Sequence, residues 1–281
     1  MTTLRACVIG HPVADSRSPL IHNHWLSLHG IAGEYVREDI LPAEIELFLI
    51  TFPLSGYIGG NVTVPYKENA FIAVRGRDAV AEALGAVNTL WHEDGELFGA
   101  NTDVYGFLAN LDESAPRWPE RTKTALVLGA GGSARAAVHG LLERSVETVL
   151  VANRTRARAE QLNAHFGRRI EPIAIHDIPS RLAGVDLLIN TTTLGMRGQP
   201  PLEIDLARLK PGALVNDFVY VPLETPLLHR ARAAGHLAVD GLGMLLHQAV
   251  PAFERWFGVR PKVTPELRSL VVADLAREGL A

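Results

Sequence analysis

A glycine-rich turn between a buried strand and a helix is the feature that most constrains what this chain can fold into. The segment GAGGSA, residues 129–134, follows the apolar run ALVL and opens a helical pattern, so it fits the fingerprint G-x-G-x-x-G/A with alanine in the third position. In such a turn the first glycine permits the tight bend, and the second lets backbone N–H groups approach a pyrophosphate at the helix N-terminus. The alternative is a tight strand–helix turn without a ligand. The context favours a Rossmann-like, doubly wound domain that binds a dinucleotide.

The end of the next strand indicates which dinucleotide is bound. Nicotinamide-binding domains usually offer an Asp or Glu there to the ribose hydroxyls, but this chain has Asn153, followed by Arg154, Thr155, Arg156 and Arg158. If Thr155 caps the following helix, Arg154 and Arg158 share a face and Arg156 points elsewhere. A guanidinium fork suits the 2′-phosphate that distinguishes NADP from NAD. The pattern therefore predicts NADP, and an ordinary solvated basic helix face is the alternative.

Composition sets broader limits on the protein. The 281 residues suit two domains, and the hydrophobic and charged fractions of 47% and 21% are typical of a globular protein. The single cysteine, Cys7, excludes an internal disulfide, favours a reducing compartment and is expected in the core. A net charge of −4 argues weakly against a nucleic-acid partner.

The sequence also lacks the patterns of membrane and metal proteins. No apolar run approaches the ~18 residues of a membrane span, and the N-terminus lacks the pattern of a signal peptide. The eleven histidines form no ligand spacing such as HExxH, so we expect no metal. We therefore expect a cytoplasmic protein with no membrane partner, either a monomer or a homodimer.

Strand and helix patterns alternate along the first hundred residues. We expect strands at 5–10, 35–40 and 58–64, helices at 18–30, 43–52 and 65–74, and a hairpin over 85–103. Ser18 suits the cap of the first helix and Pro19 its first position, while Pro65 suits the start of the third. Asp94–Gly95 fits the turn of the hairpin.

Apolar strands separated by helices continue in the second half and indicate a parallel sheet covered on both faces. Besides the strand before the glycine turn and the helix after it, we expect strands at 147–155, 185–192, 212–220 and 236–241, and helices at 104–114, 156–166, 244–258 and 264–280. Two α/β domains follow, with a boundary near residue 104.

Two charged residues are candidates for chemistry. Lys67 falls in the first turn of an expected helix, where the helix dipole disfavours a cation. It is either a tolerated surface lysine or one whose pKa is lowered for proton transfer. Asp103 lies where a strand passes into a helix, so it is either an N-cap or a carboxylate paired with a buried cation.

Four polar residues are candidates for ligand binding. Ser16 and Ser18 precede or begin a helix, and with its N-terminus they can hold a carboxylate. Thr63 and Asn88 lie in or at the ends of expected strands, where ligands of α/β sheets often bind. Asn88 can equally satisfy a hairpin.

Nine segments, in this order, resemble the shikimate dehydrogenase family and span residues 10–249. The segments are GHPVADSRSP, GGNVTVPYKE, GAVNT, GANTDVYG, GAGGSARA, NRTRAR, INTTTLGM, NDFVYVPLETPLL and DGLGMLLHQA. The resemblance implies an NADP-dependent oxidoreductase that reduces 3-dehydroshikimate to shikimate, a step in chorismate and aromatic amino-acid biosynthesis. Thr193 and Ser133 depart from the serine and alanine common in the family, and both are small residues.

The resemblance also implies roles for individual residues. Lys67 and Asp103 match the catalytic pair of the family. The implied substrate contacts are Ser16, Ser18, Thr63, Asn88, Asp103, Tyr220 and Gln248. The implied cofactor contacts are Gly129, Ala130, Gly131, Gly132, Ser133, Asn153, Arg154, Thr155, Arg158, Phe218 and Gly241.

The implied domain arrangement follows the same family. Residues 1–103 would form the substrate domain and residues 104–240 the NADP domain. Residues 241–281 would be helices that return to the substrate domain.

Three alternatives have the same architecture. A quinate or aminoshikimate dehydrogenase would keep the pair of Lys67 and Asp103, and the serine pair favours shikimate over quinate without excluding it. A non-catalytic regulator that senses the metabolite would be expected to lack the lysine or the aspartate, or to add a DNA-binding segment. A folate dehydrogenase would lack the DSRSP and NTD segments in this order.

Overall fold

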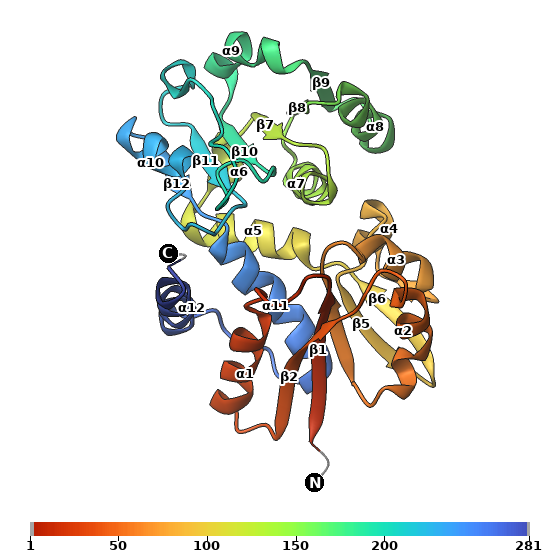
Figure 1. Ribbon diagram of the computed structural model, residues 1–281. Helices are drawn as coiled ribbons and strands as arrows, with labels where there is room; N and C mark the ends of the chain where they lie inside the picture. Colours follow the sequence, from red (N-terminus) through yellow and green to blue (C-terminus); the bar gives the residue numbers. More distant parts are fainter. Residues whose placement is uncertain (1–2, 280–281) are drawn as a thin grey trace. The chain divides into compact units, whose positions relative to one another are not determined.

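The computed structural model describes residues 3–279, which divide into two compact units. The first unit holds the residues up to Asp103 together with Leu246–Val271, and the second holds Val104–Leu245 and the residues from Val272 onward. Each unit is an α/β structure built on a six-stranded sheet (Figure 1). The two α/β domains predicted from the alternating patterns are therefore present.

The sheet of the first unit has the strand order β2-β1-β3-β5-β6-β4. Its strands are β1 (Leu4–Gly10), β2 (Gly33–Asp39), β3 (Gly59–Val62), β4 (Gly76–Arg77), β5 (Thr89–Glu93) and β6 (Glu96–Ala100). Its helices before residue 103 are α1 (Ser18–Leu28), α2 (Ile45–Thr51), α3 (Lys67–Ala73) and α4 (Ala79–Leu84). Strand β1 pairs in parallel with β2 and β3, and β5 and β6 form the predicted antiparallel hairpin. Asp94 and Gly95 both have positive φ at its turn, as a two-residue hairpin loop requires.

Strand β1 is apolar on both faces because both faces of the sheet are covered. Cys7 and Ile9 point to one side, in a core cluster with residues of α2 and α3. Ala6 and Val8 point to the other side and pack in a cluster with Trp256 of α11 (Leu242–Phe257). This alternation with a period of two explains why the run ACVI contains no polar residue.

Two helix starts in the first unit differ from the predictions. Ser18 is the first residue of α1 and does not cap it; instead, Ser16 Oγ accepts a hydrogen bond from the N–H of Ser18 at 3.3 Å. Helix α3 begins at Lys67, whereas Pro65 lies in the preceding turn after a cis peptide bond with Val64. Lys67 therefore occupies the N-terminal position of its helix, where the helix dipole disfavours its ammonium group most.

The second unit has a fully parallel sheet with the strand order β12-β11-β10-β7-β8-β9. The strands are β7 (Thr124–Leu128), β8 (Thr148–Ala152), β9 (Ile170–Ile173), β10 (Leu187–Asn190), β11 (Leu214–Asp217) and β12 (Leu237–Val239). The helices are α5 (Asp103–Ser114), α6 (Trp118–Arg121), α7 (Gly132–Glu143), α8 (Arg156–Phe166), α9 (Ile178–Arg181) and α10 (Pro226–Ala233). This is the doubly wound order of dinucleotide-binding domains, so the predicted Rossmann-like fold is confirmed.

Strand β9 and helix α10 of the second unit were not predicted, and neither were the short helices α6 and α9. Strand β9 lies at the edge of the sheet and contains Glu171 and Pro172, so its sequence lacks an apolar pattern. An edge strand tolerates proline because one of its sides has no ladder partner. Helix α10 begins after Thr225, whose Oγ1 accepts a hydrogen bond from the N–H of Leu228 at 3.3 Å.

The C-terminal helices α11 and α12 (Pro265–Arg277) are divided between the units. Leu246–Val271 belong to the first unit, where the Trp256 side chain donates a hydrogen bond to the carbonyl of Leu90 at 2.9 Å. The start of α11 and the end of α12 belong to the second unit, although the sequence analysis assigns all of 241–281 to the first. The helix expected over 264–280 ends at Arg277, and position 280 lies outside the described residues.

Candidate active site

Lys67 and Asp103 form an ion pair in the first unit. The Nζ of Lys67 lies 2.5 Å from Oδ2 of Asp103, and the two side chains are only 28% and 16% exposed. Asp103 is the first residue of α5, but its side chain does not cap the helix, because Asn101 Oδ1 accepts the N–H of Asp103 at 2.9 Å. The side chain of Asn101 thus satisfies the first N–H of α5, and the carboxylate of Asp103 holds the ammonium group.

Asn88 holds the other oxygen of the same carboxylate. Its Nδ2 donates to Oδ1 of Asp103 at 2.9 Å and to Oγ1 of Thr102 at 3.0 Å. Its Oδ1 accepts the backbone N–H of Thr102 at 2.9 Å, so the amide is held from both ends. The carboxylate thus receives one cationic and one neutral donor, on opposite oxygens, and its orientation is fixed.

Gln248 of α11 joins this cluster in the first unit. The hydroxyl of Thr102 lies 3.4 Å from Oε1 of Gln248. The contact places a residue 146 positions further along the chain beside the ion pair. Of the predicted site residues, the structure therefore brings Lys67, Asp103, Asn88 and Gln248 together.

Ser16, Ser18 and Thr63 lie where β1 and β3 end. Parallel strands of one sheet end at the same edge, and α1 starts from that edge with Ser16 and Ser18 at its N-terminus. Thr63 follows β3, and its methyl carbon would lie 2.6 Å from a Cβ placed on Gly10. Glycine at position 10 is therefore what lets the two strand ends approach each other. Ser16 and Thr63 are partly exposed and Ser18 is buried.

In the second unit, the predicted glycine turn forms the N-terminus of α7. Gly129 has φ +110°, and a Cβ at this position would lie 2.6 Å from Oγ1 of Thr191, so glycine is required. A Cβ at Gly131 or Gly132 would meet no atom within 4 Å, so the space beside these backbone N–H groups is open. Ala130 and Ser133 lie in the same turn. Open space at a helix N-terminus fits the pyrophosphate of a dinucleotide.

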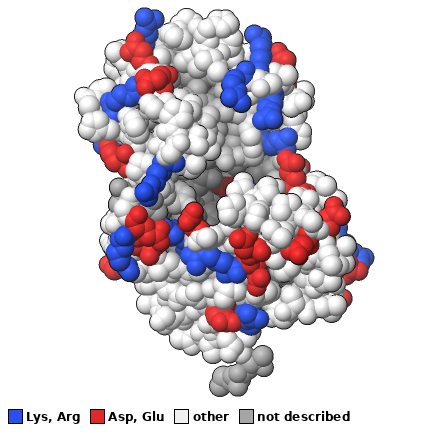
Figure 2. Space-filling view, viewed as in Figure 1, with Lys and Arg blue, Asp and Glu red and all other residues white. Residues whose placement is uncertain are grey.

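The basic segment after β8 has two arginines available for an anion. Thr155 is the N-cap residue of α8, and its carbonyl accepts Nδ2 of Asn153 at 2.8 Å. Arg156 is bound to Glu160, with Nε and Oε1 2.9 Å apart. Arg154 and Arg158 are exposed, and neither is paired with a carboxylate of residues 3–279. Figure 2 shows basic side chains over the part of the second unit that holds α8. These donors fit a 2′-phosphate.

Phe218, Tyr220 and Gly241 lie in the loops that follow β11 and β12. The N–H of Gly241 donates to the carbonyl of Val219 at 3.3 Å. A Cβ at Gly241 would lie 2.2 Å from the carbonyl oxygen of Phe218, so only glycine permits the two loops to touch. The ring of Phe218 packs against Phe107 with centroids 5.4 Å apart. Tyr220 thus belongs to the second unit, whereas the other predicted substrate contacts belong to the first.

Asp217, which is not among the predicted site residues, anchors the loop that carries Phe218 and Tyr220. Asn190 and the backbone N–H of Val219 donate to its Oδ1 at 2.9 and 3.1 Å, and Thr225 donates to Oδ2 at 2.7 Å. The carboxyl is fully buried, and this burial raises its pKa to about 6 despite the three donors. The segment NDFVY did contain a signal for this residue, because an acidic side chain at the end of a buried strand needs hydrogen-bond partners.

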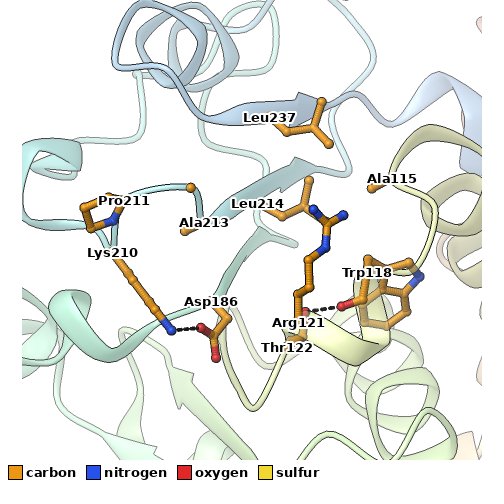
Figure 3. A pocket seen from close by; sticks show the side chains of 11 residues that line it. Ala115, Trp118, Arg121, Thr122, Asp186, Lys210, Pro211, Ala213, Leu214 and Leu237 are labelled. Carbon is orange, nitrogen blue, oxygen red and sulfur yellow. Dashed lines mark hydrogen bonds and ion pairs between the residues drawn. The ribbon is translucent and has the colours of Figure 1, made fainter.

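A cavity of about 260 Å³ lies at the N-terminal ends of the strands of the second sheet, whereas the glycine turn lies at their C-terminal ends (Figure 3). Asp186 on its wall accepts the backbone N–H groups of Lys123 and Thr124 at 2.9 and 3.0 Å and is paired with Lys210. These contacts join the starts of the neighbouring strands β7 and β10, and they satisfy the carboxylate of Asp186. The arrangement holds the sheet together and is distant in topology from the glycine turn.

Residues 3–279 contain neither a metal-binding cluster nor a membrane-spanning helix. No group of three or more His, Cys, Asp or Glu side chains in this range is arranged to hold a metal ion. No helix in the same range is long and apolar enough to cross a membrane.

Family models match three parts of the chain. The models are described as shikimate dehydrogenase substrate binding domain, shikimate / quinate 5-dehydrogenase, and shikimate 5′-dehydrogenase C-terminal domain, and they match residues 8–90, 115–195 and 241–265. A shikimate dehydrogenase (NADP(+)) of Azorhizobium caulinodans is 58% identical over 275 residues, which are 98% of each chain.

Solved structures have the same architecture. Shikimate 5-dehydrogenase from Thermus thermophilus, in complex with NADP(H) and shikimate, is 34% identical with a TM-score of 0.87, over 96% of this chain and 100% of that chain. Quinate dehydrogenase from Corynebacterium glutamicum, in complex with NAD, is 31% identical with a TM-score of 0.89, over 96% and 99% of the two chains.

Proposed function

The chain belongs to the shikimate dehydrogenase family, and we propose that it catalyses the reversible NADPH-dependent reduction of 3-dehydroshikimate to shikimate. The observation that carries this proposal is the ion pair of Lys67 and Asp103, held at 2.5 Å and fixed by Asn88. A fold alone does not define a reaction, but this pair supplies the proton donor that reduction of a ketone requires.

Lys67 is the proton donor in the proposed mechanism. NADPH, when bound, supplies the hydride that reaches the ketone carbon. Negative charge then grows on the ketone oxygen, and the ammonium group of Lys67 can both stabilise that charge and transfer a proton to it. In the reverse direction the neutral amine takes the proton from the hydroxyl.

Asp103 keeps the ammonium group in place throughout the reaction. Its Oδ2 holds Lys67, and its Oδ1 is held by Asn88, so neither oxygen needs to reorganise when the proton moves. A preorganised carboxylate of this kind lowers the cost of bringing donor and acceptor into line. Asp103 would also accept a hydrogen bond from a hydroxyl of the substrate.

The remaining polar residues of the first unit support binding of the substrate. Ser16 and Ser18, at the N-terminus of the eleven-residue helix α1, would bind the ring carboxylate. Thr63, Asn88 and Gln248 would bind its hydroxyls. Tyr220 of the second unit is the remaining proposed substrate contact.

The second unit would bind NADP through three groups of residues. The turn Gly129–Ser133 offers backbone N–H groups to the pyrophosphate. Asn153 and Thr155 would contact the adenosine ribose, with Arg154 and Arg158 on the 2′-phosphate. Phe218 and Gly241 would lie against the nicotinamide.

We propose that the protein acts in the cytoplasm, in the synthesis of chorismate and aromatic amino acids, as a monomer or a homodimer. Its one cysteine, Cys7, is buried and free, which suits a reducing compartment. The second candidate function is a quinate dehydrogenase, which the likeness to the structure from Corynebacterium glutamicum favours.

Absorbance of the reduced nicotinamide tests both candidates. The purified protein is mixed with shikimate or quinate, each with NADP⁺ or NAD⁺. Fast reduction with shikimate and NADP⁺ alone supports the proposed substrate and cofactor. Faster turnover of quinate or with NAD⁺ would assign the chain to a sister activity, and no turnover from a folded protein would favour a metabolite sensor.

A further inference from the structure

A chain of buried polar side chains leads away from the ion pair in the first unit. Tyr35, Asn61, Thr89 and Asn88 are each no more than 5% exposed. Asn61 of β3 and Thr89 of β5 face each other directly in the antiparallel register. Nothing in the proposed mechanism uses Tyr35, Asn61 or Thr89, yet burying so many polar groups is costly unless all are paired.

The hydrogen bonds of this chain run in one direction. The hydroxyl of Tyr35 donates to Oδ1 of Asn61 at 2.7 Å, and Nδ2 of Asn61 donates to Oγ1 of Thr89 at 3.2 Å. The hydroxyl of Thr89 donates to Oδ1 of Asn88 at 3.0 Å, and Nδ2 of Asn88 donates to Asp103 at 2.9 Å. Each group donates forward and accepts from behind, which is the arrangement in which successive hydrogen bonds strengthen one another.

The far end of the chain is Tyr35 of β2. Its hydroxyl is buried and donates to Asn61, so the chain starts from a neutral donor inside the first unit.

The ring of Tyr35 is held rigidly between neighbours. His22 stacks on it with centroids 4.2 Å apart, and Trp256 lies 6.0 Å away. Burial lowers the pKa of His22 to about 3, so this ring is neutral and brings no charge beside the chain. The hydroxyl of Tyr35 is therefore held against Asn61.

We propose that Tyr35 and Thr89 are positioning residues that fix the orientation of Asn88 and, through Asn88, of Asp103. The amide of Asn88 donates to Asp103 only while its oxygen faces Thr89 and Thr102. Alignment of the catalytic pair thus depends on buried side chains outside the pair. This inference rests on the proposed function, because Asn88 orients a catalytic pair only if Lys67 and Asp103 act on the substrate.

Thr89→Val removes the central hydroxyl while keeping the branched shape of the side chain. We expect kcat for shikimate to fall about tenfold, which is the effect of one lost hydrogen bond, with the KM for NADP⁺ unchanged. The pH profile of kcat should also change, because Asn88 then holds the carboxylate beside Lys67 less firmly. Thr89→Ser keeps a hydroxyl and should restore kcat to within about twofold, together with the wild-type pH profile.

Thr122→Val is the matched control in the second unit. It removes a buried hydroxyl that donates to the carbonyl of Trp118 at 2.8 Å, and neither kcat nor its pH profile should change. Circular dichroism of each variant reports whether it is folded. If Thr89→Val does not fold, Tyr35→Phe with the same measurements takes its place.

A double-mutant cycle tests the link from Tyr35 to Asn88. Tyr35→Phe and Thr89→Val interrupt the same chain, so the loss of kcat in the double variant should be smaller than the product of the single losses. Full additivity, or a Thr89→Val variant with the wild-type kcat and pH profile, would overturn the proposed link while leaving the dehydrogenase activity intact. A wild-type protein without turnover of shikimate would overturn both the function and the link.

Discussion

The two unpaired arginines after β8 allow the cofactor preference to be tested quantitatively. The variants are Arg154→Ala, Arg158→Ala and the double variant. Arg156→Ala is the control from the same segment, because Arg156 is already bound to Glu160 at 2.9 Å. The structure thus offers two guanidinium groups, and not three, to a 2′-phosphate.

The expected magnitude follows from this count. A hydrogen bond to a charged group contributes about 1.5–3 kcal/mol, and both side chains are exposed, so the lower value applies. Since about 1.4 kcal/mol corresponds to a tenfold change in affinity, each single variant should lower kcat/KM for NADP⁺ about tenfold and the double variant about a hundredfold. NAD⁺ lacks the phosphate, so its kcat/KM should change by less than about twofold.

Steady-state kinetics with both cofactors, at two salt concentrations, provide the assay. The KM for NADP⁺ of the wild type should rise with salt because exposed charge pairs are screened, and the double variant should lose this dependence. Equal losses for NADP⁺ and NAD⁺ would show that the arginines stabilise the fold and do not bind a phosphate. If kcat/KM for NADP⁺ falls as much in Arg156→Ala as in Arg154→Ala, the absence of an ion pair does not identify the arginines that bind the phosphate.

Three further predictions concern the proton donor and two buried titratable groups. Lys67→Met should lower kcat by about 10² or more with the KM for shikimate changed far less; near-normal turnover would exclude Lys67 as the proton donor. His22 has a pKa lowered to about 3, so its neutral form stabilises the fold above pH 6.5, and this contribution is lost as the pH falls; between pH 7.5 and 5 the wild type should lose about 2 kcal/mol of unfolding free energy relative to His22→Gln, measured by urea titration. Asp217, with its pKa raised to about 6, should act in the opposite sense, and the wild type should gain about 2 kcal/mol relative to Asp217→Asn between pH 7.5 and 4.5. A constant difference across pH in either pair would contradict the stated protonation states.

Three features of the second unit could be predicted from short segments of sequence. The glycine turn, the strand before it and the basic segment after β8 are each encoded by consecutive residues, and all lie where expected. The cap of α5 was not predictable in the same way, because Asn101, Thr102 and Asp103 are all good capping residues. Only the structure shows that Asn101 accepts the N–H of Asp103 and that the carboxylate of Asp103 holds Lys67.

Strand β9 and the network of Asp217 were missed for a related reason. An edge strand needs few apolar residues, so Glu171 and Pro172 conceal it from a search for apolar runs. Asp217 is buried between loops that are distant along the chain, and its partners Asn190 and Thr225 come from different elements. Such contacts leave no periodic trace in the sequence.

The sequence by itself determined the fold class, the dinucleotide turn and the preference for a 2′-phosphate, because each depends on backbone conformation and charge within a short segment. The tertiary structure decided which polar groups act together. Lys67 and Asp103 are 36 positions apart, and Asn61 meets Thr89 only through the register of β3 with β5. By contrast, Arg156 and Glu160 pair four residues apart on α8, which is local helix geometry, and this pairing leaves Arg154 and Arg158 without a carboxylate partner within the described chain. Hydrogen bonds between distant residues depend on strand register and helix packing, which the whole chain decides together.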